Sequence, residues 1–251
     1  MMSKTLFNYL QALGDDSLIL AQRLCEWSGK APTIEVDLTL SNIALDLIGQ
    51  VQLFLGYAGE VEGEGRDADR LAYHRAAEAF RNCLLVEQPN GDFAQTMARQ
   101  LLFSTYCELL FDALCASSDQ RIAEIAAKAV KEVRYHAEVA ADWTLRLGDG
   151  TEESHTRMQD GLDWFWRFED ELFAVGEGES GLVAQGIAAD KTGLRAEYDH
   201  RIDAVLAPAG LERGETSWPL GGGRDGKHSE HLSPLLAEMQ VLPRAHPDAR
   251  W

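Results

Sequence analysis

The sequence lacks several features that would each indicate a particular class of protein. None of its apolar runs approaches the roughly 18 uninterrupted residues that a transmembrane helix needs, so it predicts no membrane span. The opening MMSKTLFNYLQALGDD has one lysine and ends in two aspartates, a pattern unlike a secretory signal. The four cysteines show no close metal-binding spacing, which predicts small core residues in a reducing cytoplasm.

Basic residues are also scarce. Lysine and arginine number 23 against 41 aspartates and glutamates, which gives a formal net charge of −18 and a pI of about 4.7. A protein that binds nucleic acid over a broad surface needs the opposite sign, so this function is excluded. A phosphorylated small molecule would need only a local basic patch. Hydrophobic residues make up 45% of the 251 residues, which is enough for a large core.

The most informative stretch is residues 123–148, AEIAAKAVKEVRYHAEVAADWTLRLG. Its apolar residues recur at alternating steps of three and four, which predicts one long amphipathic helix. Glu132 and His136 lie within its inward stripe, one turn apart. An ionisable group that is buried without a partner costs a few kcal/mol. The pair therefore requires a metal site, a polar network or a partly solvated groove.

Strand signals are nearly absent, and helical patterns cover most of the chain. The expected helices are 15–27, 35–57, 68–82, 93–116, 152–175, 194–206 and 228–241, with loops at 59–69, 176–190 and 207–226. Asp15 and Asp16 are expected at the positive N-terminal end of the first helix, and Asp92 is expected to cap the helix that follows it. The helix at 35–57 is the most apolar and is expected to be buried nearly all round.

This order of elements predicts an all-α fold with a ferritin-like four-helix bundle core. Two helical hairpins, 15–57 and 93–147, are joined by a long crossover, which is the connectivity of ferritin-like bundles. Additional helices follow in a C-terminal extension, 176–251. No linker or repeat interrupts the chain, so we interpret residues 1–251 as a single ferritin-like domain.

A ferritin-like di-iron centre takes one Glu from one helix of each hairpin and Glu-x-x-His from the other. In the second hairpin Tyr135 stands three residues after Glu132, and His136 comes one residue late. In the first hairpin Gly49 stands three residues after Asp46. The sequence therefore predicts no metal, cofactor or catalytic residue in this chain.

The remaining carboxylates fit no better, since Glu108 lies about one turn from the matching position and Glu26 lies near the end of its helix. We interpret the polar core positions as a degenerate metal site whose side chains satisfy one another in a buried network. Its members are Asp46, Gln50, Glu132, Tyr135 and His136. A single metal ion or a solvated cleft is the alternative.

Three further motifs carry weaker signals. His228 and His231 have a spacing that could touch a metal, but a loop-to-helix junction with a capping serine explains it better. The glycine-rich run 221–226 predicts backbone that turns tightly or approaches another segment closely. The aromatic run Trp164–Phe168 places rings on more than one side of its helix, which indicates either a partner or the crossover packed against it.

Five segments carry a resemblance to a known family. They are DLTLSNIALDLIGQ (37–50), LLVEQPNGDFAQTMARQ (84–100), KEVRYH (131–136), RLGDGTEES (146–154) and GKHSEHLSPLLAEMQ (226–240). In this order they resemble the C subunits of bacterial phenylacetyl-CoA epoxidases, the oxygenase complexes of aerobic phenylacetate degradation. The resemblance runs from the first helix to the C-terminus.

The resemblance implies a ferritin-like, structural and non-catalytic subunit in the cytoplasm. It implies that the di-iron centre and the acyl-CoA site belong to a paralogous A subunit, with which this chain forms a heterodimer. It also implies further subunits, including an NADPH-dependent reductase. The alternatives are a stand-alone ferritin-like di-iron oxidase or oxygenase and a free-standing helical interaction module. The expected contact surface is one face of residues 36–54 or of the opening helices beside it, extended by 164–168 and 221–239.

Overall fold

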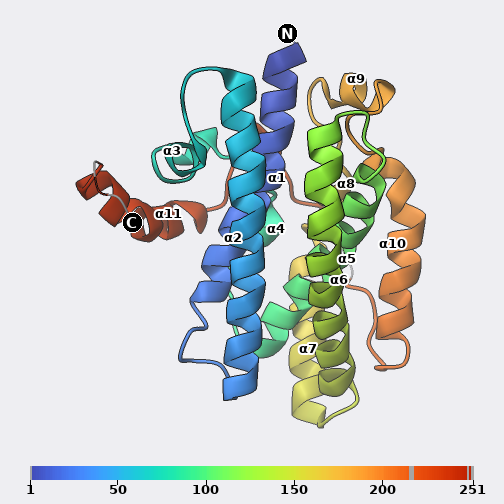
Figure 1. The fold of residues 1–251 in the computed structure, drawn as a ribbon. Coiled ribbons are helices and arrows are strands. Elements are labelled where there is room, and N and C mark those ends of the chain that lie inside the picture. The colour runs from blue at the N-terminus through green and yellow to red at the C-terminus, as the bar shows by residue number, and fades with distance from the viewer. Residues whose placement is uncertain (1, 215–217, 248, 250–251) are drawn as a thin grey trace. The chain divides into compact units, whose positions relative to one another are not determined.

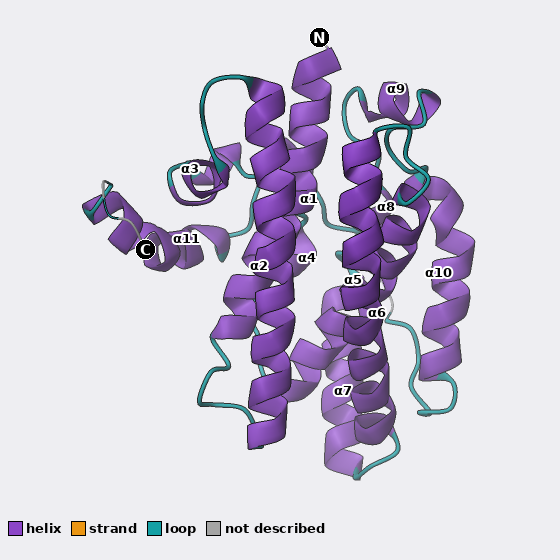
Figure 2. Ribbon diagram, in the orientation of Figure 1, coloured by secondary structure: helices purple, strands orange, loops and turns teal. Residues whose placement is uncertain are grey.

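The fold is all-α and ferritin-like, as the sequence predicts. The computed structural model describes residues 2–214, 218–247 and 249, and Figure 2 shows helices and loops but no strand among them. The long helices are α1 (Met2–Cys25), α2 (Ile34–Glu62), α5 (Phe93–Leu114), α6 (Gln120–Gly148), α7 (Glu152–Trp166), α10 (Lys191–Leu206) and α11 (Leu232–Ala245). The short ones are α3 (Ala68–Tyr73), α4 (Leu84–Glu87), α8 (Asp170–Phe173), α9 (Glu179–Ala184) and two 3₁₀ turns, Ala77–Ala79 and Gly223–Asp225.

The chain forms two compact units, and each contains one of the predicted hairpins (Figure 1). The first unit comprises Met1–Pro89 together with Gly222–Trp251, and its hairpin is α1 packed along α2. The second unit comprises Asn90–Gly221, and its hairpin is α5 packed along α6, with α7 and α10 against α5. The chain therefore returns to the first unit after completing the second.

Helix α1 begins thirteen residues before the predicted start at Asp15. Asp15 and Asp16 do not interact with a helix N-terminus as predicted, because they lie in the middle of α1 and are 0% and 4% exposed. Gly14 lies within α1 and does not break it, and α2 packs closely against it. A Cβ atom added at Gly14 would lie 2.6 Å from Leu55 Cδ2. The glycine thus permits the tight contact between α1 and α2.

Helix α2 begins after Thr33, whose side chain accepts a hydrogen bond from Val36 N, and ends at Gly63, which has φ of 76°. The prediction that it is buried nearly all round is wrong, because Ile34, Leu38 and Leu45 are 76%, 59% and 67% exposed. Length and composition would also allow α2 to cross a membrane. The core helix of a soluble protein passes the same test, and 44% of the apolar window is buried here.

Local signals set most boundaries in the second unit. Asp92 caps α5 as predicted, in a reciprocal capping box with Gln95. Helix α6 starts after Asp119, close to the predicted start, and α7 starts after Thr151, which caps it. The predicted helix 152–175 is interrupted after Trp166, and its last turn is the separate helix α8. The predicted loop 207–226 is irregular where described, but its residues 215–217 lie outside the described part of the chain.

The aromatic run of α7 is mostly internal. Phe165, Trp166 and Phe168 are buried, and only Trp164 is substantially exposed, at 40%. The loop after α10 covers the second aromatic side, since a Cβ atom added at Gly214 would lie 2.6 Å from Trp166 Cβ. This loop, rather than the crossover, covers Trp166, while a partner at the exposed Trp164 stays a prediction.

The cysteine prediction is only half right. All four thiols are free, with Cys83 and Cys107 buried, but Cys25 and Cys115 are exposed.

Candidate functional site

The five predicted network residues are divided between the two units. Asp46 and Gln50 lie on α2, in the first unit. Gln50 is 1% exposed, and its Oε1 accepts a hydrogen bond of 3.3 Å from Ser17 Oγ on α1. Asp46 is half-buried, while its predicted neighbour in the polar strip, Asn42, is exposed.

The other three residues lie on α6, in the second unit. His136 is 2% exposed, so the polar residue in the inward stripe is indeed buried. The Glu132 side chain is 21% exposed and lies 3.8 Å from Lys128 Nζ, one turn away on the same helix. Tyr135 is 45% exposed and therefore lies on the outer side of α6. A single network that joins all five side chains stays a prediction.

The residues present do not fit the di-iron centre that the fold family would imply. Gly49 offers no ligand, and a Cβ atom added there would meet nothing within 4 Å. Tyr135, the counterpart of the second imidazole, faces solvent. Glu108 is held by two arginines, with Arg134 Nε at 3.2 Å and Arg201 Nη1 at 3.1 Å. Among the described residues, no group of three or more His, Cys, Asp or Glu side chains could hold a metal.

The structure also contains a buried polar site that the sequence did not reveal. Glu87, at the end of α4, is 0% exposed. Its carboxylate accepts hydrogen bonds from Asn82 Nδ2 at 2.9 Å, His228 Nδ1 at 2.8 Å and Ser229 N at 2.6 Å. We call Asn82, Glu87, His228, Ser229 and Arg23 the Glu87 cluster. It attaches the segment before α11 to the crossover, and all of its members belong to the first unit.

Both ring nitrogens of His228 face acceptors of the crossover. Nε2 lies 3.2 Å from Phe80 O, and Nδ1 lies 2.8 Å from Glu87 Oε2. The Glu87 carboxylate also accepts from Asn82 Nδ2 and Ser229 N. The side chain of His228 is 6% exposed, so the imidazole is held between two segments and away from solvent.

Arg23 extends this cluster through backbone carbonyls. Its Nη2 donates to Glu87 O at 2.6 Å and to His231 O at 3.2 Å. The guanidinium thereby joins α1 to α4 and to the residue that precedes α11. The predicted junction at His228–His231 is correct, but the predicted serine cap is not. The N-cap of α11 is His231, with no side-chain cap hydrogen bond.

Two buried ion pairs attach the same segments to the middle of α1. Asp15 pairs with Arg75, and Asp16 Oδ2 accepts from Arg224 Nη2 at 2.7 Å. A Cβ atom added at Gly223 would lie 2.2 Å from Asn82 O, so only glycine allows this approach. The glycine-rich run therefore makes the close backbone contact that the sequence predicts. The sequence offered one indication that these residues matter: EQP (87–89) and HSEH (228–231) both lie in segments that carry the family resemblance.

The second unit has its own buried acid. Glu169 is 2% exposed, and its Oε2 accepts from Arg195 Nη2 at 2.8 Å. Burial raises the pKa of Glu169 to about 7; the Arg195 and Arg213 charges oppose this rise, and Asp199 and Asp170 add to it.

The hydroxyl of Tyr198 is buried as well. Burial, together with the nearby negative charge of Glu169, raises the pKa of Tyr198 well above its usual value. The Glu169 region holds acids and arginines in pairs and presents no free nucleophile.

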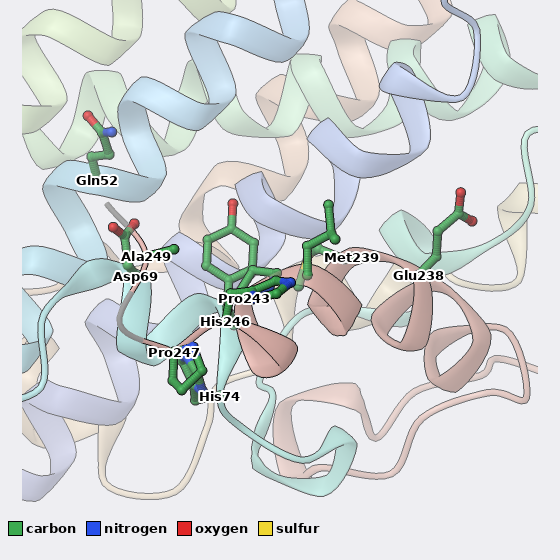
Figure 3. A pocket seen from close by; sticks show the side chains of 11 residues that line it. Gln52, Asp69, His74, Glu238, Met239, Pro243, His246, Pro247 and Ala249 are labelled. Atoms are coloured by element: carbon green, nitrogen blue, oxygen red, sulfur yellow. The ribbon is translucent and has the colours of Figure 1, made fainter. Parts of the chain in front are cut away.

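A pocket of about 520 Å³ opens between α2, α3 and α11 in the first unit (Figure 3). Figure 3 labels Gln52 from α2, Asp69 from α3, and Glu238 and Met239 from α11 among its lining side chains. Burial lowers the pKa of His74, which also lines it, and the positive charges of Arg70 and Arg244 act in the same direction. The lining mixes apolar and charged groups without the convergent polar set of a catalytic centre.

Comparisons with known proteins agree with the resemblance in the sequence. The family model described as "Phenylacetic acid catabolic protein" matches residues 1–251. The chain is also similar to the C subunit of the 1,2-phenylacetyl-CoA epoxidase of Escherichia coli (strain K12). The two are 46% identical over 243 residues, which covers 97% of this chain and 98% of that protein.

Proposed function

Because the chain belongs to the phenylacetic acid catabolic protein family, we propose that it is the structural C subunit of a multicomponent phenylacetyl-CoA epoxidase. In this role it carries no catalytic residue. It stabilises a paralogous A subunit, which holds the di-iron centre that epoxidises the aromatic ring of phenylacetyl-CoA. A reductase that takes electrons from NADPH completes the system in the cytoplasm.

One observation carries the proposal: the similarity extends over 97% of this chain and 98% of a protein whose name makes it the C subunit of such an epoxidase. The side chains support the non-catalytic part independently. Tyr135 and Gly49 occupy the two positions at which a di-iron site of this fold would have imidazoles, and neither supplies one. The buried polar clusters also suit a scaffold, because their charges are already paired with one another.

The test is co-expression of this chain with its cognate A subunit, followed by sizing and turnover of phenylacetyl-CoA with the reductase. The expected result is a stable hetero-oligomer, with iron bound by the A subunit alone. The A subunit without this chain should be less soluble and less active. A monodisperse, fully active A subunit would contradict the structural role. About two irons per purified copy of this chain, with an oxo-bridge absorption band, would favour a self-sufficient di-iron enzyme.

A further inference from the structure

The buried acid of the second unit is held very differently from Glu87. Glu87 accepts three hydrogen bonds, whereas Glu169, which is 2% exposed, accepts one from the described residues, donated by Arg195 Nη2 at 2.8 Å. Its other oxygen, Oε1, is buried and has no hydrogen-bond partner among those residues, and the same is true of the Tyr198 hydroxyl. An ionised carboxylate is costly in such a site, because burial removes its water and a single donor does not replace it.

The arginine that reaches this carboxylate is shared with two other acids. Arg195 Nη1 donates to Asp170 Oδ1 at 2.9 Å, and its Nε donates to Asp199 Oδ1 at 3.1 Å. Arg213, in the loop after α10, donates to the same Asp199 oxygen at 3.0 Å and to Asp203 Oδ1 at 2.6 Å. The cluster therefore sets four carboxylates against two guanidinium groups, and uptake of one proton would halve the excess of negative charge.

The surroundings of each acid decide which one takes up that proton. The side chains of Asp170 and Asp203 are 61% and 58% exposed, so water stabilises their charges. Burial raises the pKa of Glu169 to about 7, although the charge of Arg195 opposes this rise. The pKa of Tyr198 is raised by burial and then by the charge of Glu169, so the two groups lie close together. A proton on Glu169 Oε1 makes this oxygen a donor, and the phenol oxygen beside it can accept.

The segment that carries Glu169 is short. Helix α8 has four residues, with a turn before it and irregular backbone from 174 to 178. It meets α10 through Phe173, whose ring lies edge-on to Tyr198 at 5.1 Å and 4.9 Å from the Arg195 guanidinium. The Arg195 side chain is 34% exposed, and partly exposed ion pairs stabilise little. A helix of one turn is also weak by itself, so this segment can open without unfolding of the whole unit.

We propose that residues 167–178 form a proton-linked closure, which packs against α10 while Glu169 holds a proton and opens when that proton leaves. In the open form water solvates the ionised carboxylate, and the rings of Phe173 and Tyr198 become accessible. The charged and titratable groups around Glu169 belong to α8, α10 and the following loop: Asp170, Arg195, Tyr198, Asp199 and Arg213. Helices α5 and α7 add the rings of Tyr106 and Trp166. The closure is a property of the second unit alone and does not depend on the proposed function.

The test is hydrogen exchange of the full-length chain between about pH 5.5 and about pH 7.5, corrected for the intrinsic pH dependence of exchange. In the open segment Glu169 regains its ordinary pKa of 4.5, so opening becomes roughly twentyfold more frequent across this range. We expect the protection factors of peptides within 167–178 to fall at least about tenfold in wild type and less than about twofold in Glu169→Gln. Asp170→Asn is the matched control, because it removes an acid of the same cluster that is 61% exposed, and it should keep most of the wild-type fall.

Constant protection in wild type would overturn the proposal, since the segment would then open without any change in the charge of Glu169. An equal fall in Glu169→Gln would assign the titration to another group and overturn it as well. If Glu169→Gln does not fold, low concentrations of urea decide the point in wild type, because local opening exposes little surface and is insensitive to urea. Urea sensitivity equal to that of peptides from α1 would mean that the chain unfolds as a whole and that residues 167–178 are no separate closure.

Discussion

The Glu87 cluster gives the sharpest prediction about stability. Replacing Glu87 with alanine removes a fully buried carboxylate that accepts three hydrogen bonds. It leaves His228 Nδ1, Asn82 Nδ2 and Ser229 N without their acceptor in a buried site. Each buried polar group that is left without a partner costs about 1–3 kcal/mol, so we expect a loss of about 3–5 kcal/mol in total. This is a large part of the roughly 5–15 kcal/mol that stabilises a typical domain.

The matched control is Glu26→Ala. Glu26 accepts a 2.7 Å hydrogen bond from Arg23, a member of the same cluster, but its side chain is 40% exposed. Its loss should cost less than about 1 kcal/mol, because the Glu26 carboxylate is partly solvated and Arg23 keeps its hydrogen bonds to Glu87 O and His231 O. The contrast therefore separates the removal of a buried carboxylate from the removal of a partly exposed one.

The assay is urea unfolding of the full-length chain, with a double-mutant cycle between Glu87→Ala and His228→Ala. We expect the two changes to be non-additive by about 1–3 kcal/mol, because each removes the same pair. Limited proteolysis should also cleave residues 222–231 faster in either variant, since the pair attaches this segment to α4. A loss below about 1 kcal/mol for Glu87→Ala, or additivity within about 0.5 kcal/mol, would refute the reasoning.

Three further predictions concern pH, helix contact and ligand binding. Glu169 has a folded pKa of about 7, above its ordinary 4.5, so its contribution to stability is complete below pH 4.5 and is lost as pH rises through 7. At about 1.4 kcal/mol per pKa unit this amounts to about 3 kcal/mol. In the Glu169→Gln variant, the free energy of unfolding should not show this decline with pH. Parallel curves of unfolding free energy against pH for wild type and variant would contradict the assignment. Gly14→Ala should lower the free energy of unfolding by about 1–2 kcal/mol, because the added methyl group meets Leu55. Gly49→Ala should raise it by about 0.5–1 kcal/mol, because its methyl group meets nothing and alanine favours the helix. Equal thermal midpoints for the two variants would contradict this contrast between a packed and an open glycine. The isolated chain, with its charge of −18, should bind acyl-CoA weakly by calorimetry, and micromolar affinity at moderate salt would disprove this.

The local chemistry of the sequence determined most helices and several of their ends. Apolar spacing located α5 and α6, and Asp92 and Thr151 begin their helices because a side-chain oxygen next to the first turn satisfies its free N–H groups. The identities of Gly49 and Tyr135 also sufficed to exclude the usual imidazole ligands of a di-iron centre. The five segments that resemble the epoxidase C subunits needed no coordinates.

Only the tertiary structure decided which polar residues form hydrogen bonds and ion pairs with one another. Glu87 and His228 are separated by 141 positions, so no periodicity in the sequence relates them. Asp15 and Asp16 have the appearance of a helix start, yet they are internal counter-ions for arginines that the crossover and the C-terminal segment supply. Similarly, hydrophobicity marked α2 as a buried helix, but which of its sides the rest of the chain covers depends on packing. Local preferences involve neighbours within about one turn, whereas burial and ion pairing depend on segments that only the complete fold brings together.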